Sequence, residues 1–598
     1  MKMNTPKYSD GINTIVQKSF GGADRRVSAC DGTIFDMTNM TSDYYPVLST
    51  RGLRALYEDY NVVMSKLGMD WEDGIAKTLM NVCDVSDVPY YVFRYYNYES
   101  QIVSLSVAMV NNDGEVKNIK IYEKSAPTYS DAVQCFDRVQ AVAFNNKMLV
   151  IHNEFAICVY YDGNMLVHER IDYSWLAHEN DMNDAMLWHT SDRTYLQIKL
   201  KRFTIEDLIH QQDTLCVRDP GYVAGRKETE YYLTVINKSH VQDLDEDECL
   251  LLECELNSDV GASRDPDDDK EYDPSTSYTY YSIMHKVPHL EHVCVCRDRI
   301  WGTIGNEIYS CSSGEYRNWY RYDNTAADSF YAEIGAVSCF TGIASYAGSV
   351  YFFTREDVYR MYGTTPDAFS LVALGTYGIE ESESRSFAVA SQTMFYNSAM
   401  GPVCFNGSNA VLIGSSLGLD APKNVVGAGV GSKYYMAKED KLYVYDARYG
   451  TWQIHSVPMN IFDIGVFGGR VIVFEGLQAE YLDKTEGEEI SPFDNALHSR
   501  VEFADISEGG IYGVCPMEFT LLASLEEGAE LSLSISCNGG EFTQLWSTTE
   551  TGKHIHSIRF SPKTRCDYYR LRLDGVGEWK LYSLARSYSV NASTPYGE

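Results

Sequence analysis

The stretch Val293–Tyr309 reads V-C-V-C-R-D-R-I-W-G-T-I-G-N-E-I-Y. Apolar and polar residues alternate up to a polar turn, the apolar pair Ile300–Trp301 follows, and a second turn falls at Gly305–Asn306. Alternation of this kind is typical of half-buried strands, and not of helices. The stretch therefore predicts short strands that run up and down with tight turns between them.

The same unit recurs along the chain. Fifty residues later, Gly348–Tyr359 reads G-S-V-Y-F-F-T-R-E-D-V-Y, so that Val350–Tyr351 corresponds to Ile300–Trp301. Further copies lie at Leu149–Ile151 with Ile157–Tyr160, Met394–Phe395 with Val403–Cys404, Tyr434–Tyr435 with Leu442–Tyr443, and Ile472–Phe474 with Tyr481–Leu482. A strand hairpin that returns every ~37 to 50 residues indicates a propeller or a related array. The sequence thus predicts a β-propeller.

Length and composition fit a multidomain globular protein. A chain of 598 residues is too long for one compact core, so two or three domains are expected. Apolar residues at 44% and charged residues at 22% are ordinary for a globular protein. The 46 tyrosines favour strands, because aromatic rings pack well on a pleated surface. We therefore expect an all-β fold.

Breaks in the repeat divide the chain into three parts. Residues 1–55 are rich in turns and have little periodicity, which predicts an extended arm. Residues 56–490 hold the repeated hairpins and form the expected β-propeller. Residues 491–598 are expected to form a C-terminal antiparallel β-sandwich, because Leu531–Ser536 alternates strictly and two more strands flank a predicted turn at Asp574–Gly575.

A large insertion interrupts the predicted propeller at about 172–288. About 150 residues separate the units at Leu149 and Ile300, where 40 to 50 would serve for one repeat. Within the insertion, Thr204–His210 is expected to form one short helix. The acidic runs Asp243–Glu248 and Asp265–Glu271 are interpreted as solvated loops, because Lys270 stands where a calcium-binding EF-hand loop needs glycine.

The net charge and the cysteine content limit which binding partners and which cellular compartment the sequence predicts. A net charge of −34 argues against a surface that grips nucleic acid, since that affinity comes mostly from Lys and Arg. Residues 1–30 lack the apolar core of a signal peptide, and no apolar run approaches the eighteen residues of a membrane span. Fifteen cysteines lie scattered, and Cys294 and Cys296 face the same way on one predicted strand. Reduced thiols in a protein that folds in the cytoplasm are expected.

No motif predicts a catalytic, cofactor or metal site, and we do not expect an enzyme. The spacing of His285, His289 and His292 suggests a metal, but Pro288 breaks the helix that would align the first two. The acidic residues Glu380, Glu381 and Glu383 could be the paired acids of a glycosidase, although 84 acidic residues produce close pairs by chance. The pattern Ser536-x-Asn538-x-Gly540-x-Phe542 approaches an Asp-box, which is a structural turn.

Several segments resemble one family of virion proteins. The order Gly-Gly, Asp-Gly-x-x-x-Asp-x-x-Asn, apolar-x-x-Arg-Gly is similar to the start of the β-propeller neck and tail proteins of tailed bacteriophages, including nozzle and packaged-DNA-stabilisation types. The matching residues are Gly21, Gly22, Asp31, Gly32, Asp36, Asn39, Arg51 and Gly52. Ile308–Trp319 resembles the family's outer blade edge, Val358–Leu371 its crossing between blades followed by Gly375–Ile379, and Gly401–Gly407 its next blade.

The resemblance implies a structural protein of the phage particle, located in its neck or tail. Copies would form a homo-oligomeric six-fold ring below the portal and adaptor proteins, hold the packaged DNA and let it pass without sequence-specific binding. Arg25, Arg26 and Arg51 are the cationic residues expected to reach a neighbouring subunit. The alternatives are a tail-tip protein that binds the host surface and, from another class, a carbohydrate-active propeller enzyme. The number of blades and of subunits, the fold of the insertion and the host stay open.

Overall fold

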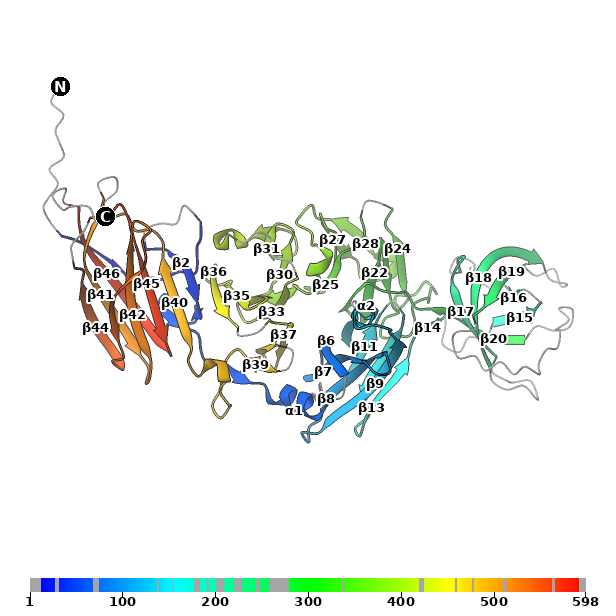
Figure 1. The fold of residues 1–598 in the computed structure, drawn as a ribbon. Coiled ribbons are helices and arrows are strands. Elements are labelled where there is room, and N and C mark those ends of the chain that lie inside the picture. The colour runs from blue at the N-terminus through cyan, green and yellow to red at the C-terminus, as the bar shows by residue number, and fades with distance from the viewer. Residues whose placement is uncertain are drawn as a thin grey trace, which may run out of the picture. The chain divides into compact units, whose positions relative to one another are not determined.

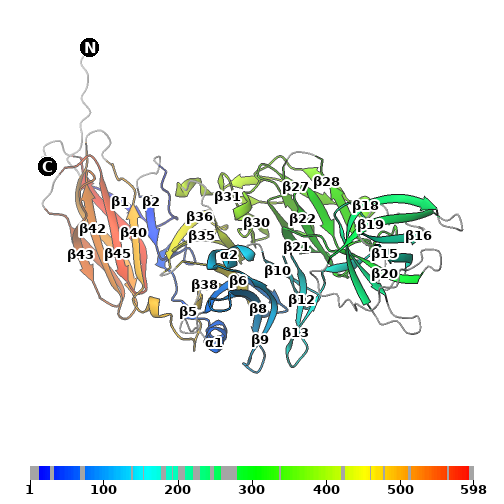
Figure 2. The same cartoon turned by 45° about the vertical axis from the view of Figure 1, so that its right-hand side comes forward.

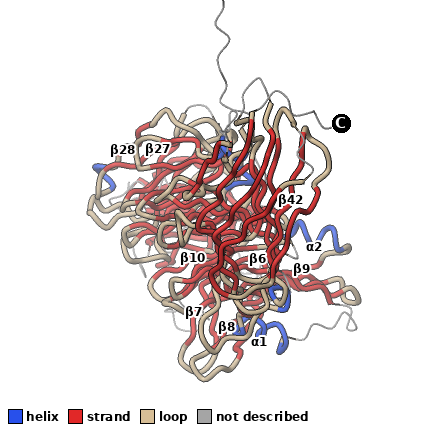
Figure 3. Tube along the Cα trace, turned by 90° about the vertical axis from the view of Figure 1, so that its left-hand side faces the viewer, coloured by secondary structure: helices blue, strands red, loops and turns tan. Residues whose placement is uncertain are grey.

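A computed structural model gives the fold, in which strands dominate and helices are short (Figure 3). The structure describes residues 12–26, 32–67, 75–136, 139–152, 154–176, 183–190, 193–199, 209–219, 229–242, 248–257, 279–335, 338–418, 424–457, 460–475, 478–508, 513–561 and 565–590. The chain divides into a central unit, residues 70–375, and a terminal unit, which joins residues 1–69 to residues 376–598. Among the described residues, no helix has the length and apolar character needed to cross a membrane.

The central unit contains four sheets of four antiparallel strands, each a meander in chain order (Figure 1). Their strands are β6 (Ile75–Val85), β7 (Val88–Asn97), β8 (Ile102–Val110) and β9 (Val116–Ser125); β10 (Gln140–Phe144), β11 (Lys147–Ile151), β12 (Ala156–Tyr161) and β13 (Leu166–Arg170); β21 (His292–Cys296), β22 (Arg299–Ile304), β23 (Glu307–Ser310) and β24 (Phe330–Glu333); and β25 (Gly342–Tyr346), β26 (Ser349–Phe353), β27 (Val358–Tyr362) and β28 (Ser370–Ala373). Helix α2 (Tyr129–Cys135) lies between the first two sheets in sequence. The first strands of successive sheets contact one another, which is the arrangement of propeller blades.

The turns of the repeated unit have the backbone that the sequence predicts. Arg297, Asp298 and Gly305 all adopt positive φ, of 50°, 57° and 53°. Two-residue hairpin loops with positive φ match the twist of the strands that they join. The strands of Val293–Tyr309 pair in register, with Val295 opposite Ile300. The local pattern thus identified a real blade.

The insertion folds as a closed sheet of its own. Its strands are β14 (Tyr173–Trp175), β15 (Asn183–His189), β16 (Thr194–Lys199), β17 (Thr214–Asp219), β18 (Thr229–Gln242), β19 (Glu248–Leu256) and β20 (Thr279–Lys286), all labelled in Figure 1, and Figure 2 shows the same part after a turn of 45°. The pairing runs β20-β15-β16-β19-β18-β17 and returns from β17 to β20, so six antiparallel strands close into a barrel, while β14 also pairs with β20. Leu196, Leu215, Leu233 and Leu252 are buried inside it.

The terminal unit contributes three more four-stranded blades. Their strands are β29 (Ala388–Ala390), β30 (Thr393–Ser398), β31 (Gly401–Phe405) and β32 (Ala410–Leu412); β33 (Val426–Val430), β34 (Lys433–Lys438), β35 (Lys441–Asp446) and β36 (Thr451–Ser456); and β37 (Asp463–Phe467), β38 (Arg470–Phe474), β39 (Ala479–Tyr481) and β5 (Ala55–Leu56). The last blade is completed from the other end of the chain, because β5 pairs with β39. Helix α1 (Glu58–Lys66) follows β5 directly. Among the described residues, four such sheets thus lie in the central unit and three in the terminal unit.

A two-layer sandwich completes the terminal unit. Sheet A has the order β3 (Met40–Thr41), β4 (Leu48–Thr50), β46 (Trp579–Ser589), β41 (Cys515–Leu525) and β44 (Gly552–Arg559), with β1 (Asn13–Gln17) also on β46. Sheet B has the order β2 (Ile34–Thr38), β40 (His498–Phe503), β45 (Tyr569–Val576), β42 (Glu530–Cys537) and β43 (Thr543–Thr548). The predicted C-terminal sandwich is therefore present, and residues 12–50 supply strands to both of its sheets.

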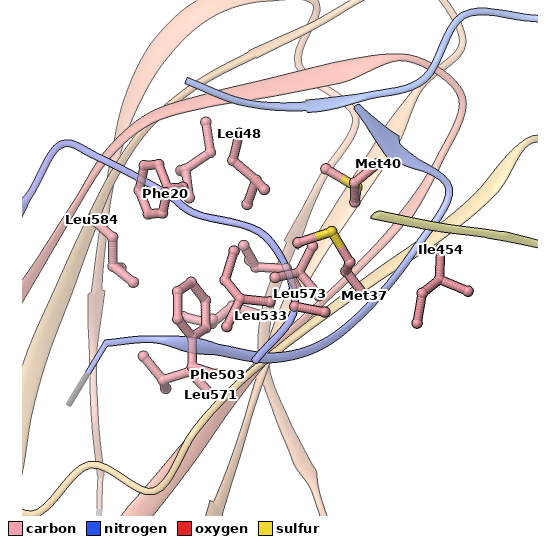
Figure 4. Packing of buried hydrophobic residues seen from close by; sticks show 14 of the residues in the cluster. Phe20, Met37, Met40, Leu48, Ile454, Phe503, Leu533, Leu571, Leu573 and Leu584 are labelled. Atoms are coloured by element: carbon pink, nitrogen blue, oxygen red, sulfur yellow. The ribbon is translucent and has the colours of Figure 1, made fainter. Parts of the chain in front are cut away.

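One apolar core runs from this sandwich into the neighbouring blades of the terminal unit. Figure 4 shows Phe20, Met37, Met40 and Leu48 of the N-terminal segment among sandwich side chains such as Leu573. The same cluster includes Ile454, Trp452, Tyr434 and Phe395 of the blades. The described residues of the N-terminal segment thus pack between the sandwich and the blades. The prediction of a separate extended arm over residues 1–55 is wrong for them.

Two local expectations are corrected by the structure. Asp574 and Gly575 lie inside β45, and the turn comes at Gly577, where φ is 76°. Gly575 is needed for close packing, because a Cβ there would lie 2.1 Å from Nε1 of Trp579. The segment Val358–Leu371 is no crossing between blades: Gly363, with φ of 97°, turns the chain back so that β28 pairs with β27 in one sheet.

Several expectations fall outside the described residues. They are most of the helix at Thr204–His210, the acidic run Asp265–Glu271 with Lys270, and Asp243 to Asp247 of the other acidic run. Glu248, the last residue of that run, begins β19.

Candidate functional site: the junction built by the N-terminal motif

The motif Gly21 to Gly52 marks the place where the N-terminal segment joins the blades to the sandwich. The backbone N–H of Ala23 donates to the carbonyl oxygen of Trp452 in β36 at 2.9 Å. A Cβ on Gly22 would lie 2.4 Å from that oxygen, so only glycine allows this approach. Gly32 has φ of 86°, and a Cβ there would lie 2.7 Å from Oε1 of Gln17. Gly22 is therefore required by close packing against the backbone of β36, and Gly32 by its left-handed conformation.

Asn39 ties three elements together through its side chain. Its Nδ2 donates to the carbonyl oxygen of His498 at 2.7 Å and to Oγ of Ser456 at 2.9 Å. Its Oδ1 accepts from the backbone N–H of Ser456 at 3.1 Å and from Nε of Arg51 at 3.2 Å. Asn39 has φ of 59°, a left-handed conformation that asparagine tolerates. The residue connects β36, β40 and the segment that precedes β5.

Two buried arginines share one carboxylate in this junction. Arg51 binds Asp494 with two hydrogen bonds, from Nη1 to Oδ2 at 2.6 Å and from Nη2 to Oδ1 at 2.8 Å. Arg54 adds a backbone N–H bond to Oδ2 at 2.7 Å and an Nη2 bond to Oδ1 at 3.0 Å. The side chain of Asp494 is 1% exposed. A bidentate pair in a buried place fixes geometry as well as charge.

Arg54 also contacts two carboxylates that lie on either side of the turn between β38 and β39. Its Nη1 is 3.3 Å from Oε2 of Glu480 and 3.8 Å from Oε1 of Glu475. Oε1 of Glu480 accepts from the hydroxyl of Ser491 at 2.5 Å. We refer to Arg51, Arg54, Glu475, Glu480 and Asp494 as the charge clasp. The charge clasp holds the segment before β5 against β39, the strand with which β5 pairs.

Burial and nearby charges shift the pKa values of two carboxyl groups of the clasp, Asp494 and Glu475, in opposite directions. Burial alone would raise the pKa of Asp494, but hydrogen bonds and charge from Arg51 and Arg54 hold it far below its usual range. Burial and repulsion from Glu480 raise the pKa of Glu475 to about 7, more than the charge of Arg54 lowers it. The neighbouring His455 has its pKa lowered to about 3 by burial and by Arg51, so it stays neutral.

This geometry favours a structural role. His455 is buried with Nε2 at 3.0 Å from the carbonyl oxygen of Met40, and its buried Nδ1 has no hydrogen-bond partner among the described residues. A cavity of about 220 Å³ lies elsewhere, in the central unit, and its lining of Val85, Ser86, Val88, Tyr90, Met109, Asn111, Asn112, Asn146 and Tyr161 has no carboxylate, imidazole or thiol. Within the described ranges, no group of three or more His, Cys, Asp or Glu side chains is arranged to hold a metal ion.

The other residues considered from sequence have structural partners. Nε2 of His285 is 2.9 Å from Oδ2 of Asp213, which ties β20 to the segment before β17. Glu383 is buried and accepts from Nδ2 of Asn397 at 3.0 Å, from the backbone N–H of Asn424 at 2.6 Å and from that of Val425 at 3.2 Å. It therefore joins two blades of the terminal unit.

The segment Ile308–Trp319 connects the insertion to its blade. The backbone N–H of Trp319 donates to Oγ of Ser174 at 2.9 Å, and the hydroxyl of Tyr320 donates to the carbonyl oxygen of Lys286 at 2.8 Å. Ser174 and Lys286 belong to the first and last strands of the insertion. This part of the resemblance also falls on a joint between elements.

The expectation that Arg51 reaches a neighbouring subunit is wrong. Arg51 is 4% exposed and forms an ion pair with Asp494 of its own chain. A buried guanidinium without such a partner would be very unfavourable, so Arg51 is not available to a neighbouring subunit. Arg25 and Arg26 bind Asp36 and Asp24 at 2.6 Å and 2.5 Å but keep part of their surface exposed. For these two the expectation stays a prediction. Asp31 lies outside the described residues.

Sequence reasoning missed Arg54, Glu475, Glu480 and Asp494. One signal was available: Arg51 and Arg54 stand three residues apart in a strongly acidic chain. Their carboxylate partners lie more than four hundred residues later, at positions that no spacing rule connects to them. The 14 cysteines in the described part of the chain are all free.

Comparisons with known proteins support no family. No protein-family model matches the chain, and no curated protein matches its sequence. Among solved structures, BamB from Moraxella catarrhalis is 8% identical, with a TM-score of 0.31 over 70% of this chain and 98% of that chain. Apo AztD from Citrobacter koseri is 10% identical, with a TM-score of 0.29 over 67% of this chain and 89% of that chain. Such distant likenesses assign no function.

Proposed function

We propose that the protein is a structural component of a tailed-phage particle, a neck or tail ring around the path of the DNA. The observation that carries the proposal is the junction. Gly22, Asn39 and Arg51 of the motif that resembles the phage proteins lie on the contacts among the N-terminal segment, the blades and the sandwich of the terminal unit. A motif whose residues hold structural elements together fits a protein with a structural role in a particle.

The construction of the terminal unit supports the same role. The N-terminal segment supplies strands to both sandwich sheets and then completes a blade, so pulling on the sandwich also loads the blade through hydrogen bonds. Force directed along the strands of a hydrogen-bonded ladder loads several bonds together. The clasp adds bidentate ionic contacts at the point where the segment enters the blade.

The charge fits a wall along which DNA slides. A net charge of −34 repels phosphates, and binding to free duplex needs several cationic groups that face them. In the proposed ring, copies retain the packaged genome by filling the exit together with portal and adaptor proteins. The duplex then leaves without adhering to the wall.

Two measurements on the full chain test this proposal. Sedimentation across a salt series should show that the chain assembles, because screening acts over about 8 Å at 0.15 M and weakens the overall repulsion between acidic copies. A gel-shift assay at 0.15 M salt should show no complex with duplex DNA. Tight duplex binding would refute the proposal. So would a monomer that persists at every salt concentration and in the presence of portal and adaptor proteins.

A further inference from the structure

In the described part of the chain, no strand or helix covers the outer face of sheet A. Its residues alternate with the buried ones of β41, β44 and β46, and they stand in rows across the strands. Ser587, Glu518 and Arg559 form one row; Val16, Ala585, Thr520 and Ser557 the next; Ser583, Leu522 and Ile555 the third; and Lys580, Ser524 and Lys553 the fourth. Ile555 is 70% exposed and Val16 is 53% exposed.

The charge of this face is opposite to that of the chain. Along the outward side of β41, β44 and β46, the charged residues are Lys553, Arg559, Lys580 and Glu518. Three cations against one carboxylate leave the face positive, in a chain whose net charge is −34. The rest of the chain is therefore more acidic than the whole. Small hydroxyl and apolar side chains fill the remaining positions, and they lose little conformational freedom when a partner covers them.

The outer face of sheet B, in the same sandwich, differs because its arginines form ion pairs within the chain. Arg500 and Arg572 both bind Asp574, at 2.7 Å each, and Arg570 binds Glu502 at 3.1 Å and also contacts Asp505. Every arginine of that face has a carboxylate from its own sheet. On sheet A, in contrast, the contact from Arg559 to Glu518 is long, at 4.0 Å, and Lys553 and Lys580 lie over the rings of Tyr582 and Tyr44.

From this contrast we infer that the outer face of sheet A docks on an acidic surface of a second copy of this chain. The inference rests on the ring proposed above and identifies the face that builds it. A second copy is always present at matching concentration and carries the complementary charge. The contact is heterologous, because two copies of the same positive face would repel each other, and heterologous contacts are those that generate rings.

Charge reversal on β44 tests the inference. The variant Lys553→Glu/Arg559→Glu should lower the self-association constant of the full chain by about tenfold or more at one fixed salt concentration. The matched control Lys438→Glu/Lys441→Glu makes the same change in net charge on β34 and β35, and it should leave the constant within about twofold. Far-ultraviolet spectra of both variants verify that the sheets are intact.

A photo-crosslinking residue at position 555 identifies the occupant. In a mixture of isotopically light and heavy chains, the crosslink should join Ile555→benzoylphenylalanine to an acidic segment of a different copy. The matched position is Val411, which is 60% exposed on β32. A crosslink between two position-555 residues, or capture of duplex DNA, would overturn the inference.

The outcomes also separate this inference from the proposed function. If the wild-type chain assembles and the β44 variant assembles equally well, the face of sheet A is not the contact, and the ring survives. If the wild-type chain remains a monomer under all conditions, both the ring and its proposed contact fall.

Discussion

The terminal unit contains two networks of arginines and carboxylates that differ mainly in burial. The charge clasp places Arg51 and Arg54 on Asp494, with side chains that are at most 5% exposed. The ladder on sheet B pairs Arg570 with Glu502 and Arg500 with Asp574, with arginine side chains that are 32% and 56% exposed. The bonds are of similar length, so geometry alone does not distinguish the two networks.

Solvent makes the difference between them. An exposed ion pair contributes about 0 to 1 kcal/mol, because water and salt screen it and two long side chains must be ordered. A buried pair contributes little relative to apolar residues, yet losing one partner costs about 3 to 5 kcal/mol, because a charge is left buried and unpaired. The clasp is therefore needed for the stability of the junction, whereas the ladder contributes little to stability and covers the outer face of sheet B with charged side chains.

The largest effect should follow from breaking the clasp at its centre. Asp494→Ala leaves both Arg51 and Arg54 without their shared acceptor and should destabilise the junction by about 3 to 5 kcal/mol. Hydrogen exchange measures this locally, because several domains need not unfold in one step. Amides of β39 and of the segment before β5 should exchange about a hundredfold faster or more.

The matched control is Asp574→Ala, which removes the shared acceptor of the exposed ladder. Its destabilisation should stay below about 1 kcal/mol, with little change in the exchange of β45. Equal effects of the two substitutions would show that burial does not separate the networks, and the comparison would fail.

The second effect is a dependence of stability on pH that comes from the clasp. The pKa of Glu475 is raised to about 7 in the folded chain by burial and by Glu480, from 4.5 in an exposed chain. The folded state then binds more protons than the unfolded state between these values, so stability falls as pH rises from about 4.5 to about 7 and is constant above. At most about 3 kcal/mol is lost in that window.

Glu475→Gln should remove this loss. The variant should be more stable than the wild type at pH 8 and similar to it at pH 5, measured by thermal unfolding at both values. Glu480→Gln is the control, because Glu480 accepts from Ser491 and pairs with Arg54, so its replacement should destabilise at both values. A Glu475→Gln variant that is less stable than the wild type at pH 8 would contradict this account, because it would mean that the ionised carboxylate stabilises the fold there.

The sequence predicted the blades because their pattern is local. Alternation and turn residues sit within one hairpin, as in Val293–Tyr309, and need no knowledge of distant partners. The strand β5 escaped prediction because Ala55–Leu56 is too short to show alternation, and its partner lies at the other end of the chain. The same distance hid the contact of Arg51 with Asp494.

The insertion and the misplaced turn show two further limits. Thr194–Lys199 alternates and could have been identified as a strand, but barrel closure depends on β17 meeting β20, which is tertiary. Asp574–Gly575 carries the letters of a turn, yet the indole of Trp579 requires glycine there inside a strand. A glycine needed for close approach and a glycine needed for a turn look alike in sequence.

The smallest expected effect is on the exposed ladder and tests it by salt. Arg570→Ala removes the pair with Glu502, the contact with Asp505 and the stacking of its guanidinium 5.2 Å from the ring of Phe35. We expect a loss of less than about 1 kcal/mol at low salt, measured by the exchange of β45. In 1 M salt, screening acts over about 3 Å, so only the part due to packing on Phe35 should remain. Asp494→Ala should keep its full effect in the same salt, because ions do not enter the clasp. If the effect of Arg570→Ala exceeded about 2 kcal/mol or ignored salt, the ladder would behave as a buried network, and the outer face of sheet B would then have to be covered by a partner.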